Sequence, residues 1–125
     1  MKCKFCYQKD ETQGHLFFEC HYTAMIWKDF QKEWGIKLEM TGIEPCCKSL
    51  TKLKQSRKIR GVIYALINAV TYHIWKARNH FVLKIQTFTP QQILQEAREQ
   101  ITQRILHLQQ YKHNYNTSID FILNR

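Results

Sequence analysis

Residues 3–20 read CKFCYQKDETQGHLFFEC and decide how the fold begins. The stretch places Cys3, Cys6, His15 and Cys20 in the pattern Cys-x2-Cys-x8-His-x4-Cys. Three thiolates and one imidazole are a common ligand set for a tetrahedral structural zinc ion. The short gap between the first two cysteines lets both thiolates reach one ion, and the histidine and last cysteine supply the second pair. The spacing therefore predicts one structural zinc ion that pins the start of the fold.

Four protein ligands leave no open coordination position, so the predicted zinc has no activated water and no catalytic role. The alternative is a set of free thiols with a surface histidine, and His21 is a rival ligand directly after Cys20. The chain has five cysteines, an odd number that excludes a complete intrachain disulfide framework. Cys46 and Cys47 are adjacent and cannot easily share one tetrahedral site. They are interpreted as one buried and one exposed thiol.

The positive charge of the chain is concentrated in its middle third. The net charge is +9, whereas residues 1–44 carry six basic and seven acidic residues, and residues 96–125 carry four and three. Residues 45–95 carry nine basic residues and no Asp or Glu. Such a block indicates a polyanionic partner, RNA or DNA. The alternative is a solvated face that only keeps the protein soluble.

The predicted phosphate contacts come from this block. The main basic set is Lys52, Lys54, Arg57, Lys58 and Arg60, and the secondary set is Lys76 and Arg78. Phe5, Tyr7 and Phe17, near the zinc ligands, are candidate stacking groups for bases, although Phe17 and its neighbour Phe18 could instead be buried.

Hydrophobic periodicity predicts one mostly α-helical domain over residues 1–125, a small zinc knuckle packed on a bundle of three to four helices. Gly35 suits a helix end, and Thr89-Pro90-Gln91-Gln92 suits a helix start with a capping box. The expected segments are a zinc knuckle at 1–20, a helix at 21–35, a connector at 36–56, a long basic helix at 57–85, a helix at 89–111 and a short helix at 117–124.

The last two helices are expected to be separated by a turn-like segment at 113–116, with Ile119, Ile122 and Leu123 facing inward. The two long amphipathic helices are expected to pair as an antiparallel hairpin, with the Trp-bearing helix at 21–35 covering one side. The apolar stripes do not require a coiled-coil dimer.

No signal peptide is visible, and no segment approaches the roughly 20 apolar residues that span a bilayer. The expected location is intracellular, in the nucleus or cytoplasm, with no membrane partner. No paired carboxylates, Gly-rich phosphate loop or nucleophilic triad is present in the sequence, so no catalytic residues are assigned and an enzyme is not expected.

Two sequence motifs of this chain resemble those of a known protein family. Cys3-Lys-Phe-Cys6, Glu11-Thr12, His15-Leu-Phe-Phe-Glu-Cys20 and the following Trp27 resemble the zinc-binding domain that follows the reverse transcriptase in plant LINE-type (non-LTR) retrotransposons. The later string Ile74-Trp75-Lys-Ala-Arg78-Asn79 resembles the downstream Ile-Trp-x-x-Arg-Asn helix of that family. The two matches span residues 3–79. The resemblance implies a zinc-binding module of a retroelement polyprotein, or of a host gene derived from one, that helps to engage RNA or DNA.

Trp75, Arg78 and Asn79 share one helix face, because they are three or four residues apart. In one interpretation Trp75 stacks on a base and Arg78 engages phosphate. In the favoured one Trp75 lies in the core, and Arg78 and Asn79 bond backbone carbonyls of the zinc segment or the connector.

The sequence therefore predicts a non-catalytic module that binds zinc and nucleic acid. The alternative function is a protein–protein or self-association module, which the amphipathic, nearly neutral helix after Pro90 favours.

Overall fold

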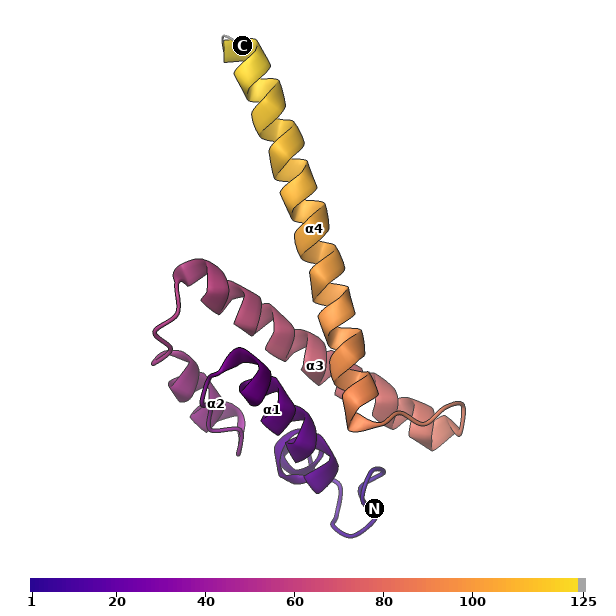
Figure 1. The fold of residues 1–125 in the computed structure, drawn as a ribbon. Coiled ribbons are helices and arrows are strands. Elements are labelled where there is room, and N and C mark those ends of the chain that lie inside the picture. The colour runs from indigo at the N-terminus through magenta and orange to yellow at the C-terminus, as the bar shows by residue number, and fades with distance from the viewer. Residues whose placement is uncertain (124–125) are drawn as a thin grey trace.

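The computed structural model describes the backbone of residues 1–123 and the side chains of residues 1–110. Within that part of the chain there is no strand, only an isolated β-bridge between Lys2 and Asp10. The predicted fold class is confirmed, because the protein is mostly helical (Figure 1). A Cys/His cluster at the N-terminus precedes the α-helices. The elements are η1 (His15–Glu19), α1 (His21–Trp34), α2 (Ile43–Leu50), α3 (Arg57–Leu83) and α4 (Pro90–Leu123).

The boundaries of α1 and α3 follow the sequence signals closely. Gly35 has a φ of 62° and ends α1 in the left-handed conformation, which glycine adopts without strain. The Ser56 hydroxyl accepts a hydrogen bond from the N–H of Ile59 and caps the start of α3. Both helices therefore begin and end within about two residues of their predicted bounds.

The connector predicted over residues 36–56 is not wholly irregular, because it contains α2. Gly42, Pro45 and the adjacent cysteines make this stretch look like a loop. Pro45 is the third residue of α2, however, and a first-turn residue has no intrahelical N–H bond to lose. Cys46 is buried and Cys47 is exposed, as expected.

The capping box at the start of α4 is confirmed. The N–H of Gln92 donates to the Thr89 hydroxyl at 3.1 Å, and the N–H of Thr89 donates to the Gln92 amide oxygen at 2.8 Å. The predicted turn at 113–116 and a separate helix at 117–124 are wrong, because α4 continues to Leu123. Residue 124 and the side chains expected to face inward from the last helix lie outside the described residues.

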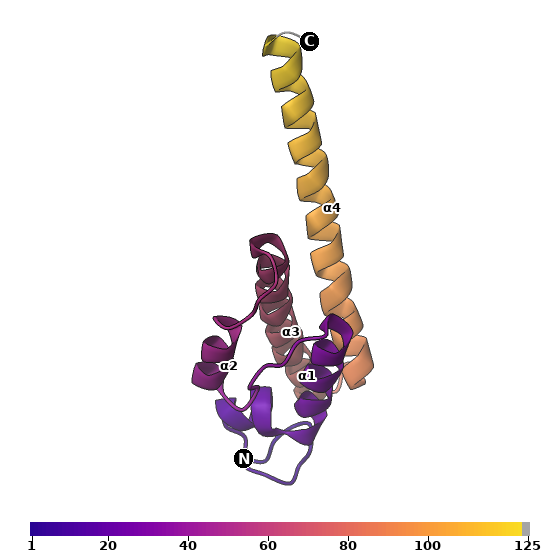
Figure 2. The same cartoon turned by 60° about the vertical axis from the view of Figure 1, so that its left-hand side comes forward.

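The hydrophobic core lies where α4 packs against α3 and α1. α4 doubles back over α3 and then projects beyond the other helices (Figures 1 and 2). Its first turns contribute to the core, whereas Leu106 and Leu108 are exposed. The largest core side chains that are fully buried include Trp27, Phe30, Ile26, Ile63, Ile74 and Ile93.

Polar contacts hold α4 in register at its buried end. The Arg98 guanidinium pairs with the Glu33 carboxylate of α1 at 2.5 Å. The ring of His73 on α3 faces two groups of α4, the Glu96 carboxylate at 3.3 Å and the Gln100 amide oxygen at 2.7 Å. These contacts fix the position of the first turns of α4 against α1 and α3.

Candidate metal centre and basic surface

Cys3, Cys6, His15 and Cys20 converge on one point. Their ligand atoms all lie within 4.8 Å of one another. The Cys3 and Cys20 sulfurs are 3.9 Å apart, and the Cys6 sulfur is 3.3 Å from His15 Nε2. A tetrahedral ion about 2.3 Å from each sulfur holds two thiolates about 3.8 Å apart, so this geometry fits a four-coordinate metal ion. The rival His21 is exposed on α1 and lies outside the cluster.

A tight turn presents the first two cysteines. The N–H of Tyr7 donates to the Cys3 carbonyl at 2.9 Å, and Tyr7 has a φ of 58° in the left-handed region. That conformation is unusual for a residue with a side chain and lets the chain reverse at once after Cys6. The N–H of Gln8 then points at the Cys6 sulfur at 3.5 Å. The backbone thus stabilises a thiolate at Cys6.

A π-helical turn presents the other two ligands. The N–H of Cys20 donates to the His15 carbonyl at 2.7 Å, the hydrogen bond between residues five apart that defines a π turn. This turn, η1, brings His15 and Cys20 together although four residues separate them. Thr12 caps the helical turn that leads into η1, because its hydroxyl accepts a hydrogen bond from the N–H of His15 at 3.0 Å.

The thiols of the cluster have opposed electrostatic environments. The hydrogen bond from the N–H of Gln8, with smaller contributions from the N–H of Lys9 and from His15, lowers the pKa of Cys6 to about 6. Burial raises the pKa of Cys20 to about 12, and the neighbouring sulfur of Cys3 adds to the effect. A metal ion at this site would displace the Cys20 proton, so its affinity should rise with pH.

Glu11 fastens the segment that carries the metal ligands, residues 1–20 and hereafter the metal segment, to α3. Its carboxylate accepts hydrogen bonds from Arg78 Nη2 at 2.6 Å, from Arg78 Nε at 3.1 Å and from the N–H of Lys4 at 3.1 Å. The Glu11 side chain is 10% exposed and that of Arg78 is 23% exposed. Burial alone would raise the pKa of Glu11, but the Arg78 and Lys4 hydrogen bonds and the Arg78 charge lower it below its ordinary value of 4.5. The carboxylate is therefore held charged.

We expect Glu11→Gln to lower the free energy of unfolding by about 2–3 kcal/mol, because it leaves the Arg78 charge partly buried without its partner. Because the pKa of Glu11 is lowered, this contribution is present above pH 4.5 and is lost as the pH falls through the lowered value. Urea unfolding of both zinc-loaded proteins across that range measures the difference.

Glu19→Gln is the matched control, because Glu19 is exposed in the same segment and should change stability by less than about 0.5 kcal/mol. Equal stabilities of wild type and Glu11→Gln at pH 7 would contradict this account.

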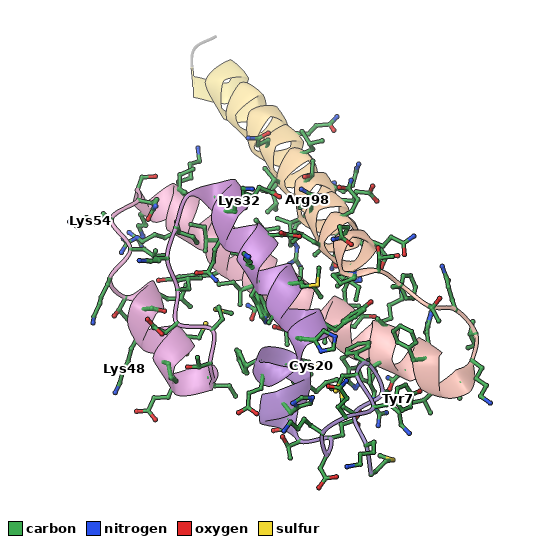
Figure 3. All side chains as sticks on the ribbon, turned by 60° about the horizontal axis from the view of Figure 1, so that its bottom comes forward. Tyr7, Cys20, Lys32, Lys48, Lys54 and Arg98 are labelled. Carbon is green, nitrogen blue, oxygen red and sulfur yellow. The ribbon has the colours of Figure 1, made fainter. Side chains whose placement is uncertain are left out.

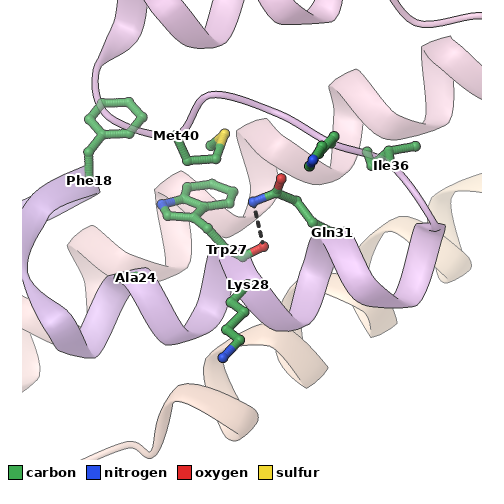
Figure 4. A pocket seen from close by; sticks show the side chains of 8 residues that line it. Phe18, Ala24, Trp27, Lys28, Gln31, Ile36 and Met40 are labelled. Atoms are coloured by element: carbon green, nitrogen blue, oxygen red, sulfur yellow. Dashed lines mark hydrogen bonds between the residues drawn. The ribbon is translucent and has the colours of Figure 1, made fainter.

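Trp27 joins α1 to the metal segment. Its indole N–H donates to the Phe17 carbonyl of η1 at 2.7 Å, and its ring stacks with that of Phe18 at a centroid distance of 6.5 Å. Figure 4 shows the Trp27 ring next to Met40, with Phe18 on one side and Gln31 on the other. The Gln31 amide donates to the Trp27 carbonyl at 3.2 Å. Trp27, the tryptophan that follows the last ligand Cys20, thus anchors η1 to α1.

The main basic set lies at the turn between α2 and α3 and in the first turn of α3. Figure 3 shows Lys54 on that turn. Arg60 is half-buried, and its Nε has no hydrogen-bond partner in the described part of the chain. The exposed members are Lys52, Lys54, Arg57 and Lys58. Lys76 is half-buried and lies about 27 Å further along α3 than Lys58, so it does not belong to the same cluster.

The metal cluster and the basic set lie at opposite ends of α3. Phe5 of the metal segment packs on Phe81 near the end of α3, with ring centroids 5.1 Å apart. It also stacks on Tyr22 at 4.4 Å, so Phe5 is a structural group and not a free stacking surface. Tyr7 is exposed but belongs to the same end. The zinc ligands, and the candidate stacking groups Phe5 and Tyr7 beside them, therefore lie far from the main basic set.

The Trp75–Arg78–Asn79 string divides between the two interpretations. Arg78 contacts the metal segment, but through the Glu11 carboxylate and not through backbone carbonyls. Asn79 accepts a hydrogen bond from Arg78 at 3.2 Å. The placement of Trp75 in the core is wrong, because its side chain is 51% exposed. We therefore remove Arg78 from the phosphate-contacting set, since its guanidinium is occupied by Glu11.

No protein-family model, no curated protein and no solved structure matches this chain. None of the helices within residues 1–123 combines the length and apolarity that a membrane crossing needs.

Proposed function

We propose that the chain is a non-catalytic nucleic-acid-binding module stabilised by one structural zinc ion. Support for zinc comes from the donor set, three thiolates and one imidazole, in a closed cluster with two fully buried sulfurs. Such a set suits zinc and leaves no coordination position for a substrate or an activated water. The zinc would hold the loop between Cys3 and His15 against the end of α3.

The observation that carries nucleic-acid binding is the charge at the start of α3. Arg57, Lys58 and Arg60 occupy its first turn, and no acidic residue is found there. The positive end of the helix dipole lies at that point, and each cation placed there costs about 0.3–1 kcal/mol of stability. The same helix end, with its free N–H groups, favours phosphate. Cations held there against the dipole support a phosphate-binding role.

Two further cations extend this surface. Lys52 and Lys54 lie on the turn before α3, and both are exposed. No Asp or Glu occurs between Pro45 and Gln95 to compete for them within the chain segment. Phosphate contacts from several cations on one turn would give binding with little sequence preference, because phosphates carry no sequence information.

We further propose that this module is of the kind that follows the reverse transcriptase in plant LINE-type retrotransposons, or is derived from one. The resemblance rests on the ligand spacing, on Glu11-Thr12 and on Trp75-x-x-Arg78-Asn79. The structure gives these motif residues physical roles that support the comparison. Thr12 caps the helical turn that leads into η1, and Glu11 pairs with Arg78, so the two motifs meet in space.

A salt titration tests the proposed binding directly. Zinc-loaded protein is titrated with single- and double-stranded RNA and DNA between about 50 and 200 mM salt. If five cations contact phosphate on a single strand, the logarithm of the association constant should fall against the logarithm of salt with a slope of about −3.5. Absence of binding at the lowest salt, or an affinity that ignores salt, would refute the proposal.

The alternative function is self-association or binding of a protein partner through α4. It is favoured by the projecting part of α4, where Leu106 and Leu108 are 54% and 56% exposed. Light scattering on nuclease-treated protein separates the two functions. A stable oligomer without nucleic-acid affinity supports the alternative, whereas a monomer that binds oligonucleotides supports the leading proposal.

A further inference from the structure

One face of α3 carries large aromatic side chains that the described part of the chain leaves about half exposed. Tyr64 is 40% exposed, and Tyr72 and Trp75 are each 51% exposed. The opposite face of the same helix is buried in the core through Ile63, Val70 and other apolar residues. Soluble proteins rarely gather exposed aromatic rings on one helix face unless the face has a partner.

These residues form a continuous stripe. Positions 64, 68, 72 and 75 are three or four residues apart, so their side chains follow one line along the helix. The rings of Tyr72 and Trp75 are neighbours, with centroids 6.1 Å apart and planes inclined by 38°. Asn68, which is exposed, adds an amide between Tyr64 and Tyr72. We call this stripe of Tyr64, Asn68, Tyr72 and Trp75 the aromatic face.

The charge around the aromatic face identifies the chemistry of its partner. α3 contains no Asp or Glu along its 27 residues. Arg57 lies on the same line as Tyr64 and Trp75 at the start of the helix, and Lys58 and Lys76 lie about 100° to one side of it. An apolar protein partner has no need of cations along the edge of its site. A polyanion with flat apolar groups uses both features.

The aromatic face also borders a groove of about 680 Å³. Tyr64 and Asn68 line one side, and Phe17, Phe18 and Leu50 are among the apolar side chains on the other sides. The groove combines ring faces with the amides of Gln13 and Asn68. Aromatic stacking together with hydrogen bonding at the edge is the way in which proteins hold an unpaired base.

We propose that the aromatic face binds single-stranded nucleic acid by stacking unpaired bases on Tyr72 and Trp75, with the neighbouring groove receiving a further base at Tyr64. This proposal rests on the proposed nucleic-acid function and makes it specific to single strands. In a duplex the base faces are already stacked on one another, so the exposed rings would find no partner there. The phosphates of the strand would lie toward Arg57 and Lys58.

The test compares single-stranded and duplex oligonucleotides on the zinc-loaded full chain. Tyr72→Ala with Trp75→Ala should weaken single-strand binding between about fivefold and about 150-fold for each stacked ring. Duplex affinity should change by less than about twofold, because the phosphate contacts remain. Both side chains are half-exposed, and circular dichroism with zinc content checks that the variants stay folded.

Tyr72→Phe with Trp75→Phe is the conservative comparison, because it keeps an aromatic ring at both positions and should restore most of the single-strand affinity that the alanine pair loses. Trp75 is also the most exposed of the three tryptophans, so the strand should quench wild-type fluorescence and leave that of Trp75→Phe nearly unchanged. The stacking proposal is overturned if the alanine pair leaves single-strand affinity intact, or weakens duplex binding equally. It is also overturned if the pair changes only the oligomeric mass, which would make the face a protein interface.

Failure of stacking can be told apart from failure of the proposed function. If the alanine pair has no effect while charge reversal at the start of α3 abolishes binding, the function stands and the aromatic face is not its site. If the wild-type chain binds neither strand form at low salt, both proposals fall.

Discussion

Cys20→Ser is expected to abolish zinc binding and to unfold residues 1–20 while the helical core persists. A structural zinc site contributes about 10 kcal/mol or more to folding, as much as the whole stability of a domain of this size. Loss of the metal leaves buried thiols and a buried imidazole without a partner. The core of α1, α3 and α4 has its own apolar contacts and should remain. Hydrogen exchange should therefore show lost protection in the N-terminal segment and retained protection in α3.

Serine at this position isolates the role of the metal. Cys20 is also the N-cap of α1, where its side chain makes no capping hydrogen bond. Serine is among the best N-cap residues, so the substitution favours the start of α1 and its penalty must come from the ligand. Cys47→Ser is the matched control, because Cys47 is exposed on α2. Metal analysis should give one zinc per chain for the control and none for Cys20→Ser. One bound zinc with an unchanged exchange pattern in Cys20→Ser would contradict the assignment.

Reversal of charge at Lys54, Arg57 and Lys58 to glutamate should weaken binding of RNA and DNA on the order of 100-fold or more at low salt. Each lost phosphate contact should also flatten the salt dependence by about 0.7–0.9, or about 2–3 in total. The variant should stay folded, because glutamate in the first turn suits the helix dipole better than the native cations do. Fluorescence anisotropy across the salt range measures both quantities.

A charge-matched variant separates a local interface from the effect of net charge. Lys28, Lys32 and Lys37 are exposed, on α1 and in the segment that follows it. Their reversal changes the net charge equally but leaves the start of α3 intact. We expect it to weaken binding by less than about tenfold. Equal losses in the two variants would show that charge alone governs binding and that the start of α3 is not an interface.

Local signals predicted much of this fold because local geometry determines it. The cysteine and histidine spacing gave the metal cluster, since short gaps hold ligands near one another whatever the rest of the chain does. Apolar periodicity gave α1 and α3, and the Thr89–Gln92 capping box gave the start of α4. The sequence signals do not predict α2, because Gly42 and Pro45 are loop-like residues at the start of a helix of only eight residues. The propensity of a segment that short says little.

Contacts between distant residues could not be predicted in the same way. Glu11 and Arg78 are 67 positions apart, and only the folded chain shows that they pair. Hydrophobic size favours the burial of Trp75, and this alone predicts a core position for it. α3, however, carries two apolar stripes, and the sequence does not say which one faces α4. The presence of Tyr64 and Tyr72 on the line of Trp75 was the signal that could have separated them.

The Glu11–Arg78 pair connects the metal segment to α3, the helix that carries the aromatic face. Arg78 lies three residues after Trp75 on α3, so residues 1–20 contact this helix about one turn beyond the aromatic face. If zinc and a nucleic-acid strand bind as proposed, each stabilises the same end of α3. Thermodynamic reciprocity then requires that a strand raise zinc affinity by the factor by which zinc raises strand affinity. In that case the affinity of the chain for nucleic acid would change with the concentration of available zinc.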